Sequence, residues 1–281
     1  MNLTKLSLAC IIMLSSATAM ADDKHPRLTE FKEKTVNAFN KTIMVDAKAA
    51  QEAEIKDPLE KLNRKVFAFN DTLDHYVAKP IANQYDKKVP EDVRGSYRAF
   101  RKNLGEPWNA VNQLLQGKPL RAAKTLGRFT INTLTTLGFA DPATRIGLET
   151  EDESFGTTLG YYGVPSGAYI MLPFFGPSTV RDTFGFLVDS QTRPQGYLLD
   201  GQEVANHTLT GLTAVDVRSK FLDIEKALPE QRDEKYSALR DAYLQAKAFE
   251  ILEKKGETLE NAFIDEVDET EDSATTPDVA E

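Results

Sequence analysis

The chain has 281 residues and a mass of 31.3 kDa, with 41% hydrophobic and 27% charged residues, enough to build one large domain or two small ones. Its formal charge of −9 comes from residues 257–281, which hold ten acidic and no basic residues. Without that tail and Lys5 the chain has 33 basic and 33 acidic residues, so a basic nucleic-acid-binding domain is disfavoured and no nucleic-acid partner is expected.

Residues 1–21 have the pattern of a secretory signal peptide. Lys5 precedes an apolar stretch from Leu6 to Ala17, and Ala19-Met20-Ala21 forms a small-x-small cleavage site before Asp22. The apolar stretch is shorter than the roughly 20 residues that a transmembrane helix needs. The only cysteine, Cys10, lies inside this leader. We therefore expect export, with no thiol, disulfide or cysteine metal site in the mature chain.

Residues 22–56 predict an N-terminal arm with at most a marginal helix, and we expect the core to lie outside it. The main domain is assigned to residues 57–256. Its first helix is expected to begin with Asp57 as N-cap and Pro58 at the first helical position, and to end before Pro80.

Proline and glycine punctuate the rest of the domain. Pro90, Pro107 and Pro119 each open a predicted helix, and the last of these stops at Gly138. Residues 138–156 predict a long loop or hairpin, the kind of connection that is often functional. Glycines and aromatics between 155 and 189 indicate short helices and tight turns. Two more helices are expected, at about 206–227 and 231–255, before a disordered acidic tail over 257–281.

The residues for catalysis are sparse. The three histidines, His25, His75 and His207, have no metal-ligand spacing, and Ser166 lies between Gly163 and Gly167 with the wrong spacing for a nucleophile elbow. His75 is favoured as an interfacial side chain. No catalytic residue, metal or cofactor is predicted.

Two surface features leave alternatives open. Arg121, Lys124 and Arg128 share one helix face, which could contact lipid head groups or an anionic rim, or could simply be solvated. The aromatic and small apolar residues in the glycine-rich segments could form a membrane or partner surface, or an ordinary core.

A series of motifs in order resembles the MlaA (VacJ) family of outer-membrane phospholipid-transport proteins. The match covers about residues 57–250 and includes Asp57-Pro58-Leu59-Glu60, Asn63-Arg64, Phe69-Asn70, Lys79-Pro80, Asn103-Leu104-x-Glu106-Pro107, Arg128-Phe129-x-x-Asn132, Asp141, Phe155-Gly156-x-Thr158-Leu159-Gly160, Leu172-Pro173-x-x-Gly176-Pro177-Ser178 and Arg181-Asp182.

The resemblance implies a mostly α-helical ring of amphipathic helices, with a small hairpin loop and glycine- and aromatic-rich turns. Such a protein lies in the periplasmic leaflet of the outer membrane beside porin trimers. Its amphipathic channel removes phospholipids misplaced in the outer leaflet and hands them to a soluble periplasmic carrier. No covalent chemistry is involved, so the chain is not expected to be an enzyme.

Residue roles follow from the same resemblance. Phe69 and Asn70 correspond to the gating pair, and the hairpin beside the channel corresponds to Gly138–Phe155, with Gly138, Phe139, Asp141, Ile146 and Leu148 as its candidate residues. Arg64, Asn103, Asn132, Arg181 and Asp182 also match motif positions, where a structural role joining helices is favoured.

The sequence departs from the family in its N-terminal signal. Family members are typically acylated on a cysteine at the cleavage site, whereas Cys10 is followed by most of the apolar stretch. We expect cleavage after Ala21 without lipidation of Cys10. The arm 22–56 is longer than expected, and Leu137-Gly138-Phe139 replaces a common glycine pair, which predicts a stiffer hinge. Two alternatives to a lipid channel remain: a porin-associated periplasmic scaffold that conducts nothing, and a secreted phospholipase using Ser166.

Overall fold

The computed structural model describes residues 40–149, 151–192, 201–225 and 228–256. The predicted signal peptide, most of the arm and the acidic tail lie outside these residues. The helices and strands in chain order are η1 Asn40–Met44, α3 Ala53–Lys56, α4 Glu60–Leu73, η2 Asp74–Ala78, α5 Lys79–Lys88, α6 Glu91–Leu115, α7 Pro119–Thr136, α8 Pro142–Arg145, α9 Phe155–Tyr161, β1 Tyr169–Leu172, β2 Gly176–Thr179, α10 Val180–Thr192, α12 Glu203–Glu225 and α13 Arg232–Lys255.

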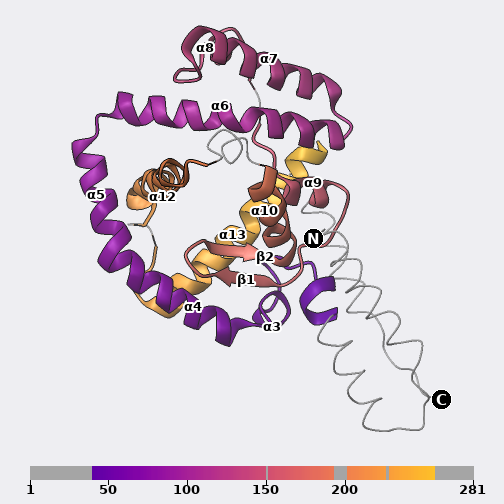
Figure 1. Cartoon of the computed structure of the whole chain (residues 1–281). Coiled ribbons are helices and arrows are strands. Elements are labelled where there is room, and N and C mark those ends of the chain that lie inside the picture. The colour runs from indigo at the N-terminus through magenta and orange to yellow at the C-terminus, as the bar shows by residue number, and fades with distance from the viewer. Residues whose placement is uncertain (1–39, 150, 193–200, 226–227, 257–281) are drawn as a thin grey trace, which may run out of the picture.

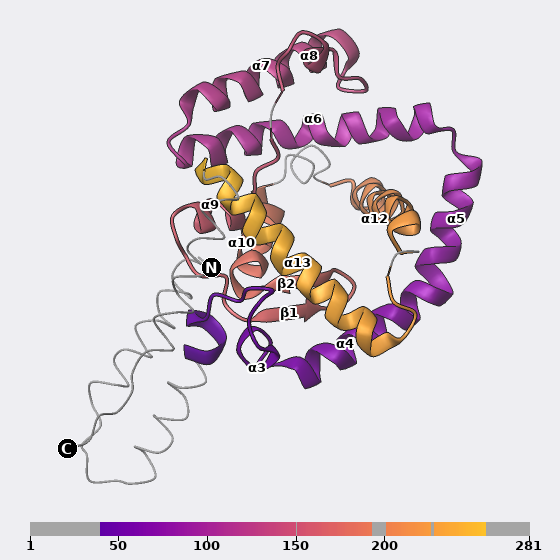
Figure 2. The ribbon, with the colours of Figure 1, turned by 180° about the vertical axis from the view of Figure 1, so that it is seen from behind.

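The helices form a ring. Figure 1 shows α4, α5 and α6 along three sides of an enclosure that α13, α9 and α10 complete, with α12 inside it. Seen from behind, α13 crosses the front of this enclosure and α7 runs along the outer side of α6 (Figure 2). The strands β1 and β2 pair antiparallel, with Tyr169 opposite Thr179 and Leu172 opposite Gly176. The predicted mostly α-helical ring is therefore confirmed.

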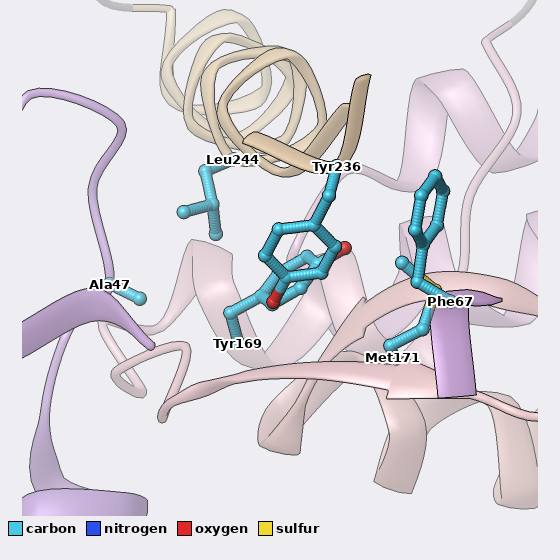
Figure 3. Close-up of a cluster of buried hydrophobic side chains, with 6 residues drawn as sticks. All are labelled: Ala47, Phe67, Tyr169, Met171, Tyr236 and Leu244. Atoms are coloured by element: carbon cyan, nitrogen blue, oxygen red, sulfur yellow. The ribbon is translucent and has the colours of Figure 1, made fainter. Parts of the chain in front are cut away.

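A small aromatic core joins α4, β1 and α13 (Figure 3). The rings of Phe67 and Tyr236 meet edge to face at 5.5 Å, and Tyr169 meets Tyr236 at 6.2 Å. Such pairs contribute about 0.5–1.5 kcal/mol each beyond the area they bury. The cluster also contains Ala47, which is 7% exposed. The expectation that the core excludes the arm is wrong, because Ala47 belongs to the core cluster and the end of the arm bonds to the segment just before β1: Ser166 Oγ accepts a hydrogen bond from Ala47 N at 2.8 Å.

Asp57 does not cap the first helix. The helix α4 begins at Glu60, its N-cap residue is Leu59, and no side chain caps it. The Asp57 carboxylate is instead buried, where it accepts hydrogen bonds from Asn63 Nδ2 at 2.7 Å and from the Tyr236 hydroxyl. The capping prediction fails because a buried carboxylate needs several donors, and these come from distant parts of the chain.

Two prolines that were predicted to separate helices lie within helical runs. The helix continues through Pro80 because the π turn η2 ends just before it, and Lys79 N donates to Asp74 O. That wider turn shifts the hydrogen-bonding pattern by one residue, so the proline ring is accommodated. Likewise, α6 runs unbroken through Pro107.

Packing against α7 explains why Pro107 does not end α6. Side chains of α6 bond to α7 on both sides of the proline: Asn103 Nδ2 donates to Thr133 Oγ1 at 2.9 Å, and Gln113 Oε1 accepts from Thr125 Oγ1 at 2.7 Å. These tertiary contacts oppose the roughly 3 kcal/mol by which an interior proline disfavours a helix. The later helices α12 and α13 confirm the predicted pair, although α12 begins at Glu203 rather than about 206.

Candidate functional site

The distribution of polar and apolar side chains is the reverse of that in a soluble protein. Among the described residues, 23 polar or charged residues are buried but only 11 hydrophobic ones, while 29 large hydrophobic side chains are exposed. Monomeric soluble proteins rarely expose large contiguous apolar surfaces, which mark contacts with partners or membranes. In the glycine-rich segments both alternatives hold for part of the chain: Tyr169 and Met171 belong to the buried core, whereas Tyr162, Phe174, Phe175 and Phe184 are exposed.

Helix α7 shows this reversal most clearly. Its buried positions are Ala122, Thr125, Arg128 and Asn132, which face α6. Its leucines point the other way, with Leu120 81% and Leu134 80% exposed. An amphipathic helix normally buries its apolar face, whereas this helix leaves leucines exposed and turns its polar face toward the protein.

Arg128 holds a buried ionic network beneath the hairpin segment, defined here as residues 138–149. Its Nε lies 3.1 Å from Glu106 Oε1 and its Nη2 lies 2.7 Å from Asp141 Oδ2. Nη1 donates to the carbonyl oxygen of Leu148 and to Thr144 Oγ1. Burial raises the pKa of Glu106, which hydrogen bonds from Arg128 and Asn109 offset in part. A charge pair this deeply buried is maintained only with full hydrogen bonding.

Asp141 connects this network to the one-turn helix α8. It caps α8 by accepting from Thr144 N, and it accepts from Asn132 Nδ2 at 3.0 Å. Burial raises the pKa of Asp141, but hydrogen bonds from Arg128, Thr144 and Asn132 outweigh it and hold that pKa at about 2. Asp141 is thus a fixed anion at neutral pH.

The remaining hairpin residues place the segment against α6. Gly138 has φ +83, and a Cβ there would lie 2.7 Å from Asn103 Nδ2, so any other residue would be strained and would displace the Asn103 side chain. Phe139 stacks on Phe100 with ring centroids 4.6 Å apart, while Ile146 is 65% exposed. In both views α8 lies beyond α6, on the side away from α12 (Figures 1 and 2).

The structure separates the three basic residues that were predicted to share one face of the helix. Arg121 is exposed and pairs with Glu151 at 3.2 Å, and Lys124 is exposed. Arg128 is only 1% exposed, so it cannot contact a head group and is corrected to a structural residue. Helical spacing placed it beside Arg121 and Lys124, but the side chain turns into the interface with α6.

Phe69 and Asn70 lie next to a different loop, the aromatic turn, defined as residues 172–176 between β1 and β2. Asn70 Nδ2 donates to Leu172 O at 2.9 Å, and Asn70 Oδ1 accepts from Phe174 N at 2.9 Å. The Phe69 and Phe174 rings meet edge to face at 5.4 Å. The structure therefore does not bring the predicted gating pair and the hairpin segment together.

The aromatic turn is strained and exposed. Phe174 has φ +67 and is 71% exposed, and Phe175 is 68% exposed. A left-handed conformation costs a non-glycine residue about 1–2 kcal/mol. The turn extends from the strands toward the inside of the ring (Figures 1 and 2). Sequence reasoning missed it as a site, although Leu172-Pro173-x-x-Gly176 marks a turn whose two central residues are phenylalanines.

Several residues match family motifs but were expected to have a structural role. In the structure they connect different helices and loops. Arg64 reaches Asp233 on α13 at 3.0 Å, and Asn132 Oδ1 accepts from Ala143 N at 3.0 Å. Asp182, beside Arg181, accepts from the Tyr243 hydroxyl at 2.8 Å. Each bond fixes one helix or loop relative to another, so buried polar contacts hold the elements of the ring together.

The hydroxyl of Ser166, the candidate nucleophile, is engaged in hydrogen bonds with the backbone. Ser166 is 6% exposed, accepts from Ala47 N and donates to Gly167 O at 2.9 Å. His75 and His207 are exposed, and His75 meets only the Tyr76 ring. Within the described ranges, no group of three His, Cys, Asp or Glu side chains could hold a metal ion, and none of the helices is long and apolar enough to span a bilayer.

Comparison with known proteins supplies the family. The MlaA lipoprotein family model matches residues 55–250. The chain is 36% identical over 198 residues to the "Intermembrane phospholipid transport system lipoprotein MlaA" of Escherichia coli K12, covering 69% of this chain and 77% of that protein. It is 33% identical over 227 residues to the protein of the same name from Haemophilus influenzae, covering 78% and 90%.

A solved structure agrees in fold. The solved structure described as "Structural basis for maintenance of bacterial outer membrane lipid asymmetry" superposes on this chain with a TM-score of 0.60 and 34% sequence identity. The match covers 69% of this chain and 98% of the other. Sequence, fold and the apolar surface together lead to one conclusion: the chain belongs to the MlaA lipoprotein family.

Proposed function

We propose that this chain is the outer-membrane component of a phospholipid transport system that maintains lipid asymmetry. It takes mislocalised phospholipids from the outer leaflet, passes them through an amphipathic passage inside the ring and hands them to a soluble periplasmic carrier. The observation that carries the proposal is the reversed burial, with 23 polar residues buried and 29 large hydrophobics exposed among those described. The names of the relatives support the same role.

The exposed leucines of α7 provide the membrane contact. A helix that lies in the interfacial plane binds through its apolar face, with strength that scales with the buried apolar area. Leu120, Leu126 and Leu134 supply such a face, and the exposed Leu137 follows directly at the end of the helix. The chain would then lie in the periplasmic leaflet of the outer membrane. Porin trimers and the carrier enter this proposal from the family resemblance.

The passage needs no covalent chemistry. Moving a phospholipid requires an apolar surface for acyl chains and polar groups for the head group, and the reacting groups of a hydrolase are not among its needs. The engaged hydroxyl of Ser166 supports a non-enzymatic role over the phospholipase alternative.

In this proposal the aromatic turn, which extends toward the inside of the ring, is the movable gate, and the hairpin segment on the far side of α6 is a fixed element. Asn70 holds the turn by two hydrogen bonds to its backbone, while Phe174 stores left-handed strain. Loss of the Asn70 amide would release the turn and leave the passage ungated. The assignment of Phe69 and Asn70 to gating thus gains a physical mechanism.

The test measures phospholipid in the outer leaflet of cells that lack this gene. We expect a rise that wild type corrects, and that neither Asn70→Ala nor deletion of Phe69-Asn70 corrects. Thr72→Ala is the matched control on α4, because its hydroxyl bonds only to Ala68 O of its own helix. No rise in the deletion strain would overturn the transport function and leave the non-conducting porin-associated scaffold as the account.

Export and anchoring are part of the proposal. The relatives are named lipoproteins, yet the only cysteine here is Cys10. Cleavage after Ala21 without acylation remains our prediction. Metabolic labelling with palmitate should leave the mature chain unlabelled, whereas label lost on Cys10→Ser would show that it carries a lipid anchor.

A further inference from the structure

Exposed apolar side chains occur on helices on both sides of the wall that α6 forms. Helix α7 runs along the outer side of α6, whereas α12 lies inside the enclosure bordered by α4, α5 and α6 (Figures 1 and 2). A bilayer around the protein can cover the leucines of α7. It does not account for apolar side chains on a helix inside the ring, so these need a different partner.

The second half of α12 carries such an apolar surface. Val217, Phe221 and Ile224 are 38%, 50% and 56% exposed, and their spacing of four and three residues places them on one face of the helix. We call these three residues the inner stripe. A helix rises by about 10 Å over this stretch, which is comparable to the roughly 15 Å of hydrocarbon in one leaflet of a bilayer.

Ion pairs on other faces of α12 keep the inner stripe exposed. Asp216, whose side chain is fully buried, accepts from Arg98 Nε of α6 at 2.9 Å. Arg218 Nη2 donates to Asp74 Oδ2 of η2 at 2.8 Å and also to Glu225 at the end of α12. Because rotation of α12 would break these pairs and leave partly buried charges unpaired, the helix cannot turn to bury its stripe.

An acyl chain suits this surface better than a protein does. The hydrophobic effect is non-directional, so a row of partly exposed apolar side chains can hold a chain of methylene groups and still let it slide. A folded partner or a second copy of this chain would have to enter the enclosure to reach the stripe, whereas an acyl chain is thin and flexible. The three side chains have no nitrogen or oxygen atom, so they offer nothing to a head group.

We propose that the inner stripe carries an acyl chain of the transported phospholipid through the ring. The inference rests on the proposed function and identifies the surface that the apolar part of its substrate follows. Because this contact recognises the acyl chain alone, it admits phospholipids with different head groups.

The first experiment identifies what touches the stripe. Phe221→p-benzoylphenylalanine is expressed in cells whose phospholipids carry radioactive phosphate, and illumination should attach labelled phospholipid to the full chain. The matched control is Thr208→p-benzoylphenylalanine, at an exposed position on another face of α12, where the hydroxyl donates to Val204 O of its own helix. It should capture at least fivefold less lipid. Capture of a protein alone, or equal lipid at both positions, would overturn the inference.

The second experiment asks whether the stripe serves transport. In cells that lack this gene, Phe221→Gln should leave at least half of the rise in outer-leaflet phospholipid uncorrected, because it places an amide in the path of the acyl chain. Phe221→Leu, which keeps the apolar surface, and Thr208→Gln should both correct as well as wild type. Full correction by Phe221→Gln would overturn the inference.

The two experiments separate this inference from the proposed function. Crosslinking does not depend on an asymmetry defect: lipid captured at position 221 in a strain whose deletion causes no rise keeps the acyl contact and loses the transport function. A rise that wild type corrects, with no lipid captured at position 221, keeps the transport function and overturns the inner stripe as its acyl surface.

Discussion

The hairpin segment and the aromatic turn are both short loops, but different forces hold them. The hairpin segment is tied to α6 and α7 by a buried arginine with two carboxylate partners. The aromatic turn is held by one asparagine amide and by the ring contacts of Phe174 with Phe69 and of Phe175 with Phe186, against backbone strain at Phe174. A loop held by buried charges resists opening, whereas one held by a single amide and by exposed aromatic rings can open locally at a lower free-energy cost. The difference favours the turn as the moving part.

The strongest test of this comparison removes the charge beneath the hairpin segment. Arg128→Met leaves Glu106 and Asp141 without their shared cation, so the free energy of unfolding should fall by about 3–5 kcal/mol. Chemical denaturation of the purified chain in detergent measures it. Lys124→Met, at an exposed position of the same helix, should change stability by less than about 0.5 kcal/mol. A loss below about 1 kcal/mol for Arg128→Met would show that the network does not hold the segment.

Two glycine substitutions compare the stability cost of a closely packed position with that of an open one. Gly138→Ala places a Cβ 2.7 Å from Asn103 Nδ2 at φ +83, and should destabilise the chain by about 2–3 kcal/mol. Gly176→Ala in the aromatic turn has φ +86 and open space around it, and should cost only about 1 kcal/mol. Denaturation of both variants checks the order. Equal losses would mean that the hairpin segment yields as easily as the turn.

Hydrogen exchange compares the mobility of the two loops directly. The Phe174 amide donates to Asn70 Oδ1, and the Leu148 amide donates to Ala143 O. Loss of the Asn70 side chain should cost about 1–2 kcal/mol, so Asn70→Ala should accelerate exchange at Phe174 about tenfold. The Leu148 amide should be unaffected. Parallel acceleration at both amides would indicate global loosening and contradict independent loops.

Acid titration should give the smallest effect. The pKa of Asp141 is about 2 in the folded chain, against about 3.9 for an unfolded aspartate. Its contribution is therefore fully present above about pH 4 and is lost as the pH falls toward 2. The difference in unfolding free energy between wild type and Asp141→Asn should be constant from pH 7 to 5 and shrink below pH 4. A difference that grows on acidification would contradict the sign of this shift.

Helices and their approximate limits were predictable because apolar spacing and proline or glycine are local signals. The helix α7 and the turn at Gly138 follow from them within one or two residues. Arg128 shows where this reasoning ends. Spacing puts it on a face with Arg121 and Lys124, but its burial depends on α6 and on Asp141, which no local pattern encodes.

The sequence alone determined the family, the helical class and the scarcity of catalytic groups, because motifs, periodicity and composition are written along the chain. The tertiary structure decided which face of each amphipathic helix turns inward. It also decided that Asp57 joins a buried cluster rather than a helix cap, and that Asn70 meets Leu172 and Phe174 about a hundred residues away. These outcomes depend on distant donors and acceptors satisfying one another out of water, and local spacing carries no information about such partners.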